Sequence, residues 1–235
     1  MGVNFAALYA YYLASPLNWL ILLCPKKFII EFMTIMIVLK IGLSGLSFAW
    51  YLKKHSQNCI LGVGFFGIFY ALSGYMAAYS WNIMWLDCIM LFPLILLGLE
   101  QLVKEKKGTL YCITLGLSIL SNYYISIMIC IFMVIYVIAQ MTLNPPKSFG
   151  EFMGTGLRFA FYSLLAGGLA AVVLLPEIYA LQVTASGDFD FPKTFSSYFS
   201  IFDMIARHIG NVGTEIGLDH WPNIYCGVAV LMFFL

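Results

Sequence analysis

The sequence predicts an all-α, polytopic bundle of transmembrane helices, and three observations carry that prediction. Hydrophobic residues make up 62% of the 235 residues and charged residues only 10%, against about 45–50% and 25% in soluble proteins. The mean hydropathy is +0.92. Several apolar stretches also reach the roughly 20 residues that a helix needs to cross a bilayer. We expect about six to seven spans, preceded by an amino-terminal helix in the membrane interface.

Charge and cysteine content exclude other classes of protein. The net charge of +1 provides no field that would attract nucleic acid, so no nucleic-acid partner is expected. The six cysteines show no C-x-x-C spacing and mostly lie in apolar runs, which favours neither a disulfide scaffold nor a metal site. Phosphate-binding glycine loops and nucleophile elbows are also missing from the sequence, which excludes the common soluble active sites.

Residues 1–27 form the first predicted element. The stretch from Phe5 to Leu23 is interrupted by Ser15-Pro16 and by Asn18, and it carries three tyrosines and a tryptophan. Proline ends or kinks a helix, and Tyr and Trp prefer the headgroup level, so we interpret this segment as a helix lying in the interface. A spanning helix is the alternative interpretation.

Residues 28–175 form the predicted transmembrane bundle. One stretch is too long for an ordinary span and carries the polar tetrad Ser121-Asn122-Tyr123-Tyr124 near its middle, so we expect two short helices that meet there. Residues 176–223 then form an outer loop with short helices, and residues 224–235 begin a further span. The apolar stretches taken as spans are Phe28–Tyr51, Cys59–Tyr79, the short Cys88–Val103, the divided Thr109–Met141, and Glu151–Leu175.

Lysines and arginines in the short loops predict the orientation of the bundle. If each span reverses the chain and residues 109–141 form a hairpin, one set of basic residues lies on the cytoplasmic side, and Lys26 and Lys27 remain outside against this rule. Residues 82–87, the turn at Asn122 and residues 177–223 then face outward. The cytoplasmic set is Lys53, Lys54, Lys104, Lys106, Lys107, Lys147 and Arg158.

The outer loop is rich in acidic residues. A solvated loop kept soluble by charge explains this composition, and a site for a divalent cation or for sugar hydroxyls is the alternative. His208 and His220 share the loop but lack a metal-ligand spacing, so we assign no metal ligand. The acidic residues are Glu177, Asp188, Asp190, Asp203, Glu215 and Asp219.

The densest group of polar and aromatic residues at a membrane boundary is Ser80–Asp87. Asp87 is expected to begin an apolar helix, where a carboxylate caps free amides and interacts with the positive end of the helix dipole. Alternatively, Asn82 and Asp87 bind polar groups of a ligand while Trp81 and Trp85 offer flat surfaces to a sugar ring or a lipid. Both interpretations require these side chains to lie together at the membrane boundary.

Two features are expected at membrane depth. The tetrad implies a cavity, because polar side chains at a broken helix face the bundle interior or water. Asn122, Tyr123 and Tyr124 are therefore candidate binding residues, with a helix cap by Asn122 as the alternative. Lys40 lies inside a span, where an ammonium needs a carboxylate such as Glu31 or an anionic ligand such as a phosphate.

At these positions the sequence resembles the YfhO family of bacterial multi-pass membrane proteins. The likeness covers nearly the whole chain. It implies a GT-C-like fold in the bacterial cytoplasmic membrane and a glycosyltransferase that moves a sugar from a polyprenyl-phosphate carrier, a membrane lipid, to a cell-envelope acceptor such as a teichoic acid. The strings that carry the resemblance are Ala10–Asn18, Tyr75–Asp87, Ser121–Ile125, Leu175-Pro176-Glu177 and Pro222–Gly227.

The resemblance also implies what this chain lacks. GT-C enzymes carry an essential carboxylate in the first outer loop, and here no acidic residue precedes Glu31. We therefore expect an internal piece of a YfhO-like protein, without the first membrane helix, that loop and the carboxy-terminal part. The catalytic carboxylate is unassigned, and whether the piece itself is an active enzyme or inert stays open.

Asp87 is the candidate for a supporting catalytic role, and a group of residues is the candidate for substrate binding. The competing function is a transporter or lipid-handling protein, motivated by the mid-membrane lysine and the broken helix. The substrate-binding candidates are Lys40, Asn82, Trp85, Asp87, Asn122, Tyr123 and Tyr124.

Overall fold

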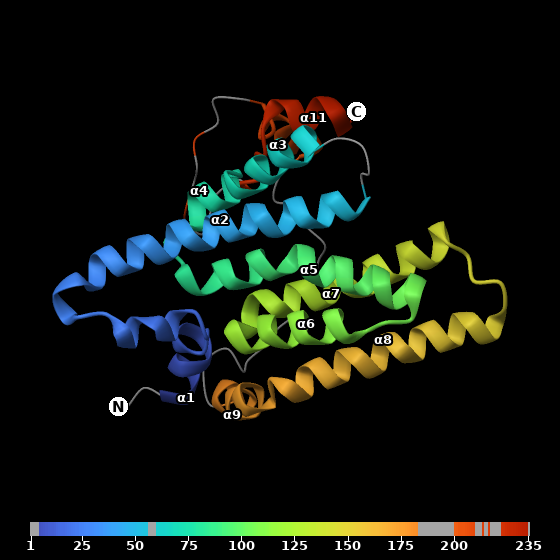
Figure 1. Ribbon diagram of the computed structural model, residues 1–235, viewed down its shortest axis with the longest axis horizontal. Helices are drawn as coiled ribbons and strands as arrows, with labels where there is room; N and C mark the ends of the chain where they lie inside the picture. Colours follow the sequence, from blue (N-terminus) through green and yellow to red (C-terminus); the bar gives the residue numbers. More distant parts are fainter. Residues whose placement is uncertain are drawn as a thin grey trace.

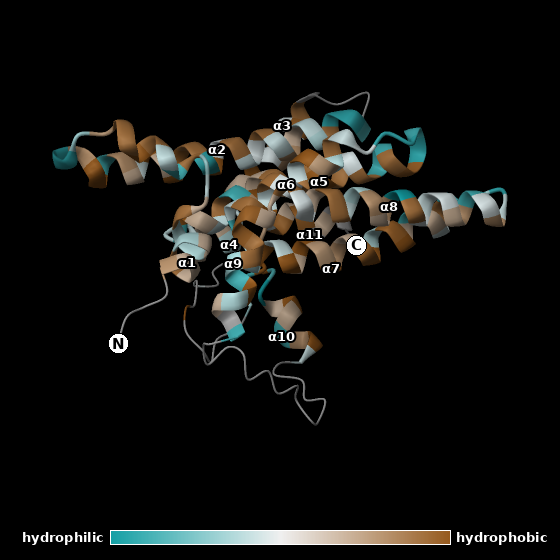
Figure 2. Cartoon of the chain, turned by 90° about the horizontal axis from the view of Figure 1, so that it is seen from below, coloured by the Kyte–Doolittle hydropathy of each residue, from teal (hydrophilic) through white to brown (hydrophobic). Residues whose placement is uncertain are grey.

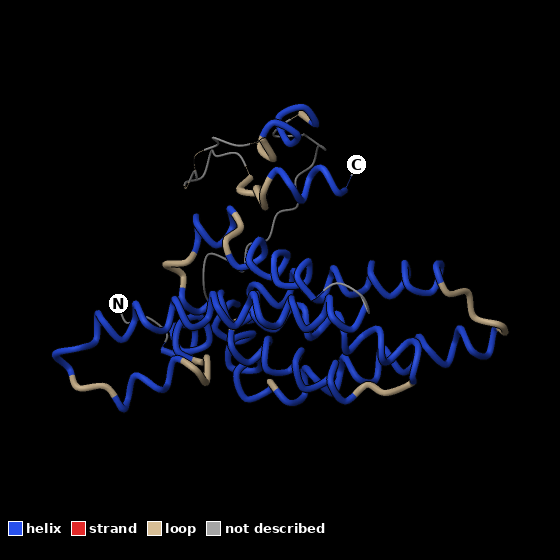
Figure 3. The backbone as a smooth tube through the Cα atoms, turned by 45° about the horizontal axis from the view of Figure 1, so that its top comes forward, coloured by secondary structure: helices blue, strands red, loops and turns tan. Residues whose placement is uncertain are grey.

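Helices are the only regular elements in the part of the chain that the computed structural model describes, which is residues 5–55, 60–182, 200–209, 213, 216 and 222–234. Figure 3 shows these helices joined by short loops. The long helices run roughly side by side (Figure 1) and bury a shared apolar core. The predicted all-α bundle is thus confirmed.

Four helical segments are long and apolar enough to cross a membrane, or five if a bent pair counts as one span. This count over the described residues is lower than the expected six to seven, because Thr109–Ser121 has only 13 residues and the last described helix only seven. The four segments are Lys26–His55, Leu61–Tyr79, Ile83–Glu105 and Tyr123–Leu143. Figure 2 shows apolar residues along the long helices and hydrophilic ones near their ends.

The amino-terminal segment is a series of short helical pieces. These are α1 (Phe5–Leu8), a π-helical turn (Tyr9–Leu13) and two 3₁₀ turns (Asn18–Leu23 and Lys26–Phe28). The single continuous helix expected here is wrong, because the chain breaks at the Ser-Pro step, as proline requires, while the interfacial position of this segment stays a prediction. The spanning alternative also fails, since none of these pieces is long enough to cross a bilayer.

Helix α2 (Ile29–His55) is followed by α3 (Ile60–Ala71) and the short α4 (Gly74–Tyr79). Helix α5 (Ile83–Glu105) begins five residues before the predicted start at Cys88. The prediction counted only the uninterrupted apolar run and therefore missed the first helical turn. Asp87 consequently lies inside α5, and its expected role as a helix cap is wrong.

The predicted break within residues 109–141 is present. Helix α6 (Thr109–Ser121) ends at Asn122, whose side chain accepts a 3.0 Å hydrogen bond from the backbone N–H of Ile125 at the start of α7 (Tyr123–Leu143). Ser118 and Ser126 lie on opposite sides of the break, and their hydroxyl oxygens are 2.8 Å apart, as expected for a hairpin. Only α6 is short, because α7 has 21 residues.

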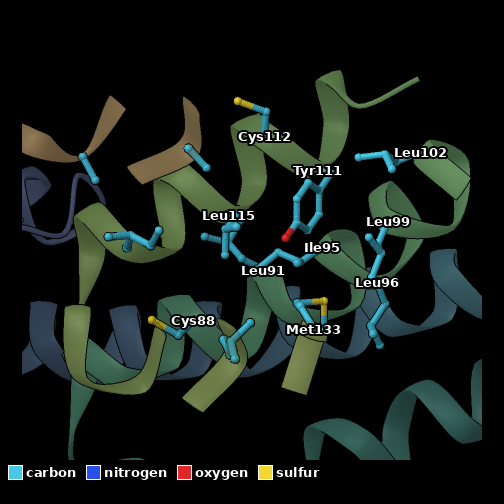
Figure 4. Close-up of a cluster of buried hydrophobic side chains, with 14 of the residues drawn as sticks. Cys88, Leu91, Ile95, Leu96, Leu99, Leu102, Tyr111, Cys112, Leu115 and Met133 are labelled. Carbon is cyan, nitrogen blue, oxygen red and sulfur yellow. The ribbon is translucent and has the colours of Figure 1, made fainter. Parts of the chain in front are cut away.

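Helices α5, α6 and α7 build the core shown in Figure 4. The α5–α6 crossing depends on Gly98, since a Cβ there would come 2.4 Å from the backbone nitrogen of Tyr111. The labelled core side chains are Cys88, Leu91, Ile95, Leu96, Leu99, Leu102, Tyr111, Cys112, Leu115 and Met133.

Helix α8 (Phe149–Leu169) and helix α9 (Ala171–Gln182) meet at a bend of 77°. The predicted span Glu151–Leu175 is thus divided by a bend, and the predicted boundary between residues 175 and 176 falls inside α9. The bend brings α9 against α1 and the π-helical turn. Two shorter helices follow, α10 (Ile201–Ala206) and α11 (Val228–Phe234).

The bundle has two distinct ends (Figure 1). The basic end carries the carboxyl ends of α2, α5 and α7 and the amino end of α8, with Lys53, Lys54, Lys104 and Lys147. The Asn122 end carries the amino-terminal pieces, the amino ends of α5 and α7, and helix α9. The basic loops expected on one side of the membrane do share one end, and Lys26 and Lys27 lie toward the other.

Candidate functional site

A buried ion pair lies at the Asn122 end of the bundle. Lys40 on α2 and Asp87 on α5 are 0% and 2% exposed, and the Lys40 Nζ lies 2.7 Å from Asp87 Oδ2. The pairing follows from the helix packing, since α2 lies against α5. A charge at membrane depth needs such a partner. The sequence singled out both residues but proposed Glu31 as the carboxylate, so the partner was not identified.

The Lys40 ammonium has all three of its donors engaged. Besides Asp87, it donates to Asn18 Oδ1 at 2.7 Å and to the carbonyl oxygen of Ile83 at 3.0 Å. An ammonium has three N–H groups, so no donor is left for a phosphate. Asn18, which the sequence offered only as a break in the first apolar stretch, is thereby a member of the site.

Asp87 uses only one of its two oxygens in this network. Its Oδ2 accepts from Lys40, and among the described residues nothing donates to Oδ1. A buried carboxylate normally fills its acceptor sites, so Oδ1 is an acceptor in reserve for a hydroxyl, an amide or a water.

Two neighbouring side chains on α5 also hold unused polar atoms. Asn82 occupies the N-cap position without capping through its side chain, and among the described residues its buried Nδ2 has no hydrogen-bond partner. The Nε1 of Trp85 is likewise buried without a well-aligned partner among these residues, and the Tyr11 hydroxyl is the acceptor within its reach. Trp81, by contrast, is 60% exposed and donates to the carbonyl of Ala78, so it does not join this group.

Aromatic rings surround these unused donors. The Trp85 ring stacks on Tyr124 at a centroid distance of 6.1 Å, and Tyr11 lies 6.3 Å from Tyr124 and 6.2 Å from Tyr123. Burial raises the pKa of the Tyr11 hydroxyl above its ordinary value, so this hydroxyl stays neutral and keeps its proton. We call Tyr11, Trp85, Tyr123 and Tyr124 the aromatic shelf.

Asn122 is completely buried, and both polar atoms of its side chain form hydrogen bonds within the protein. Its Nδ2 donates to the backbone oxygen of Tyr11 at 3.1 Å while its Oδ1 caps α7. The Cys88 thiol lies 3.6 Å from its carbonyl oxygen. The break is thus satisfied by protein groups, so the cavity inferred from it is unnecessary, and the cap interpretation of Asn122 is correct.

Glu177 is the residue that sequence reasoning placed least well. It was expected in a solvated loop, but it lies in α9 and is 2% exposed, and among the described residues its buried Oε2 has no hydrogen-bond partner. The Tyr123 hydroxyl is within hydrogen-bonding reach of the Glu177 carboxyl group. The bend between α8 and α9 produces this burial, and only the Leu175-Pro176-Glu177 string pointed to it in the sequence.

A third buried carboxylate lies at the basic end and was not expected at all. Glu100 on α5 is 4% exposed. Its Oε1 accepts from the hydroxyls of Tyr51 at 3.0 Å and Tyr136 at 2.7 Å, and its Oε2 lies 2.6 Å from His55 Nε2 and 3.3 Å from Lys104 Nζ. Both oxygens of this carboxylate are therefore saturated.

The described residues contain no group of three or more His, Cys, Asp or Glu side chains that could hold a metal ion. Most of the acidic outer-loop residues, as well as His220, lie outside the described residues. Asp203 is described and caps α10 through a box with Ser200. Chemically, the Asn122 end combines a carboxylate fixed by a cation, unused donors and flat rings, which is an arrangement suited to hydroxyl-bearing ligands.

The comparisons with known proteins agree on a single family. The model of the bacterial membrane protein YfhO matches residues 1–235. Over 133 residues the chain is 23% identical to the uncharacterized protein YfhO of Bacillus subtilis (strain 168), a match that covers 55% of this chain and 15% of that protein. The aligned part is thus a small share of that relative. No solved structure matches the chain significantly.

Proposed function

Since the chain belongs to the YfhO family of bacterial membrane proteins, we propose that it forms part of a membrane glycosyltransferase. This multi-pass protein transfers a sugar from a polyprenyl-phosphate carrier to a cell-envelope acceptor, such as a teichoic acid, on the outer face of the membrane. The observation that carries the proposal is the buried Asp87 with one oxygen held by Lys40 and the other in reserve.

In this proposal Asp87 positions a hydroxyl of the acceptor or of the sugar. One Asp87 oxygen forms a charge-assisted hydrogen bond with the Lys40 ammonium, and the other oxygen is the acceptor for the hydroxyl. In the transfer step the acceptor oxygen bonds to the anomeric carbon, the bond from that carbon to the carrier phosphate breaks, and the phosphate leaves with the electron pair. A carboxylate takes the acceptor proton, and Asp87 supports this step by positioning the hydroxyl.

The aromatic shelf gives the sugar a surface. Sugar rings present C–H groups on their faces, and a flat indole or phenol ring buries such apolar surface without competing for hydroxyls. The unused Asn82 Nδ2 and Trp85 Nε1 are donors for the sugar hydroxyls. Buried unpaired donors cost folding free energy, which is recovered when a ligand supplies their acceptors.

An apolar hollow beside the shelf suits the carrier chain. It encloses about 330 Å³ between α1, the π-helical turn and α9. Its lining includes Tyr9 and Ala10, next to Tyr11, and Pro176, next to Glu177. A lipid chain in this hollow would therefore present its phosphate and sugar to the polar groups of the shelf. The lining residues are Phe5, Ala6, Tyr9, Ala10, Val172, Val173 and Pro176.

The test is sugar transfer by the full-length protein carrying Asp87→Asn. Asparagine keeps the shape of the side chain and one oxygen for Lys40, but it leaves the buried ammonium without its counter-charge, so transfer is measured per folded molecule. The loss of the negative charge should lower that transfer at least 100-fold. The matched control is Glu105→Gln, which changes a 52%-exposed carboxylate on the same helix and should leave transfer unchanged. Transfer at the wild-type rate by the Asp87 variant refutes the role given to this residue.

A transporter or lipid-handling protein is the second candidate, favoured by the helix breaks at Asn122 and between α8 and α9. Transporters bind substrate where membrane helices are discontinuous. Vesicles holding the full-length protein, supplied with radiolabelled polyprenyl-phosphate sugar, separate the two functions. Label in envelope polymer supports the transferase, whereas label that crosses the membrane still attached to the carrier supports the transporter.

A further inference from the structure

A groove at the basic end of the bundle, on the opposite end from the proposed transferase site, has the features of a lipid-binding site. It lies between α2 and α3, encloses about 530 Å³ and falls in the size range of small-molecule sites. Four apolar side chains and two ammonium groups line it: Leu46, Ala49, Trp50, Lys53, Lys54 and Val63.

The groove arises from a close helix crossing. Gly45 on α2 and Gly67 on α3 face each other, and a Cβ on either one would lie 2.9 Å from the carbonyl oxygen of the other. Small residues at such crossings allow helix backbones to approach closely. Ala49 and Val63 lie one turn from the crossing toward the basic end, so the groove opens from the crossing toward the lysines.

Apolar and basic groups are ordered along the groove. Leu46, Ala49, Trp50 and Lys53 have the spacing i, i+3, i+4 and i+7, which places them on one face of α2. Leu46 is 64% and Trp50 54% exposed. The groove therefore runs from hydrocarbon contacts, past an indole that favours the membrane interface, to two ammonium groups.

Lys53 and Lys54 differ from the other lysines at this end of the bundle in whether they pair with a carboxylate. Lys104 and Lys107, at the same end, each pair with a carboxylate. Lys53 and Lys54 are exposed, and among the described residues no carboxylate forms an ion pair with either of them. Their charge is thus available to an anion at the headgroup level.

We propose that this groove binds one anionic phospholipid from the surrounding leaflet. An acyl chain lies along Leu46, Ala49 and Val63, the Trp50 indole lies at the glycerol level, and the phosphate contacts Lys53 and Lys54. Basic residues next to a membrane helix recognise anionic headgroups in this way. The inference does not depend on sugar transfer, because it concerns the other end of the bundle.

The experiment is native mass spectrometry of the purified full-length protein with phosphatidylglycerol or with phosphatidylcholine of the same acyl chains. The wild type should retain phosphatidylglycerol preferentially. Each lysine contributes about fivefold to the affinity, so the Lys53→Gln, Lys54→Gln double variant should bind phosphatidylglycerol more than tenfold more weakly. Leu46→Gln should weaken the retention of both lipids.

The matched control is Lys26→Gln combined with Lys27→Gln, which removes two charges just before the opposite end of α2 and should leave retention unchanged. All of these positions except Leu46 are exposed lysines, and thermal unfolding checks that each variant is folded. Equal retention of the two lipids by the wild type, or equal losses in the two double variants, overturns the proposal. Complete displacement by an equal concentration of polyprenyl phosphate also overturns it, since the groove would then belong to the carrier.

Discussion

Helix α5 carries two buried carboxylates whose surroundings differ in one respect that matters. Asp87 and Glu100 are 2% and 4% exposed and lie about 20 Å apart along the helix, given its rise per residue. Glu100 has a donor or cation on both oxygens. Asp87 has the Lys40 ammonium on one oxygen and, among the described residues, nothing on the other.

The difference separates structure from function. A saturated carboxylate has no acceptor left for a ligand, so Glu100 acts as a tie between α2, α5 and α7. Under the proposed function, a half-saturated one beside unused donors and aromatic rings binds a ligand. Burial alone therefore does not distinguish the two carboxylates, whereas unused hydrogen-bonding capacity does.

The strongest test of the comparison removes the cation from the Asp87 pair. Lys40→Met leaves a buried carboxylate without its counter-charge, which should lower the free energy of unfolding by about 3–5 kcal/mol. The measurement is thermal or denaturant unfolding of the full-length protein in detergent. Adding Asp87→Leu should restore most of the stability, because a buried pair can be replaced by apolar groups. A Lys40→Met protein as stable as the wild type contradicts the pairing.

A change at Glu100 should lower the stability of the protein and leave sugar transfer unchanged. Glu100→Gln removes a charged acceptor shared by two tyrosines, a histidine and a lysine, so unfolding should become easier by about 1.5–3 kcal/mol. Transfer per folded molecule should stay at the wild-type value. Unfolding curves and transfer assays on one preparation measure both quantities. A large fall in transfer at unchanged stability would contradict this prediction, because it would give Glu100 a role in transfer.

The smallest effect on the free energy of unfolding is expected at the break between α6 and α7. Asn122→Ala removes the cap on α7 and the bond to the Tyr11 backbone, which should cost about 1–2 kcal/mol. Asn122→Ser is the matched control, since it keeps a capping oxygen without burying a charge and, like alanine, lacks the bond to the Tyr11 backbone. If alanine and serine give the same unfolding midpoint, the cap does not stabilise the break.

The sequence predicted the helical class and the break at Asn122 because both rest on local signals, namely apolar length and a polar group inside it. It misplaced the start of α5 because Asn82 and Asp87 interrupt the apolar run without interrupting the helix. The bend between α8 and α9 was missed as well, because Ala170 carries no breaking signal such as proline.

The site was predicted as separate residues. Lys40 and Asp87 were both recognised as costly at membrane depth, yet they are 47 positions apart, and pairing at that separation depends on how α2 packs on α5. Glu100 was overlooked because a glutamate near a basic loop reads as solvated. Glu177 was assigned to a solvated loop, since its burial depends on the bend that was missed.

The most direct test of the central claim compares transfer by two variants of the full-length protein, Asp87→Asn and Glu100→Gln, each normalised to the amount of folded protein. The account predicts at least a 100-fold loss for Asp87→Asn and a wild-type rate for Glu100→Gln. A wild-type rate for Asp87→Asn, or an equal loss in the two variants, would contradict it.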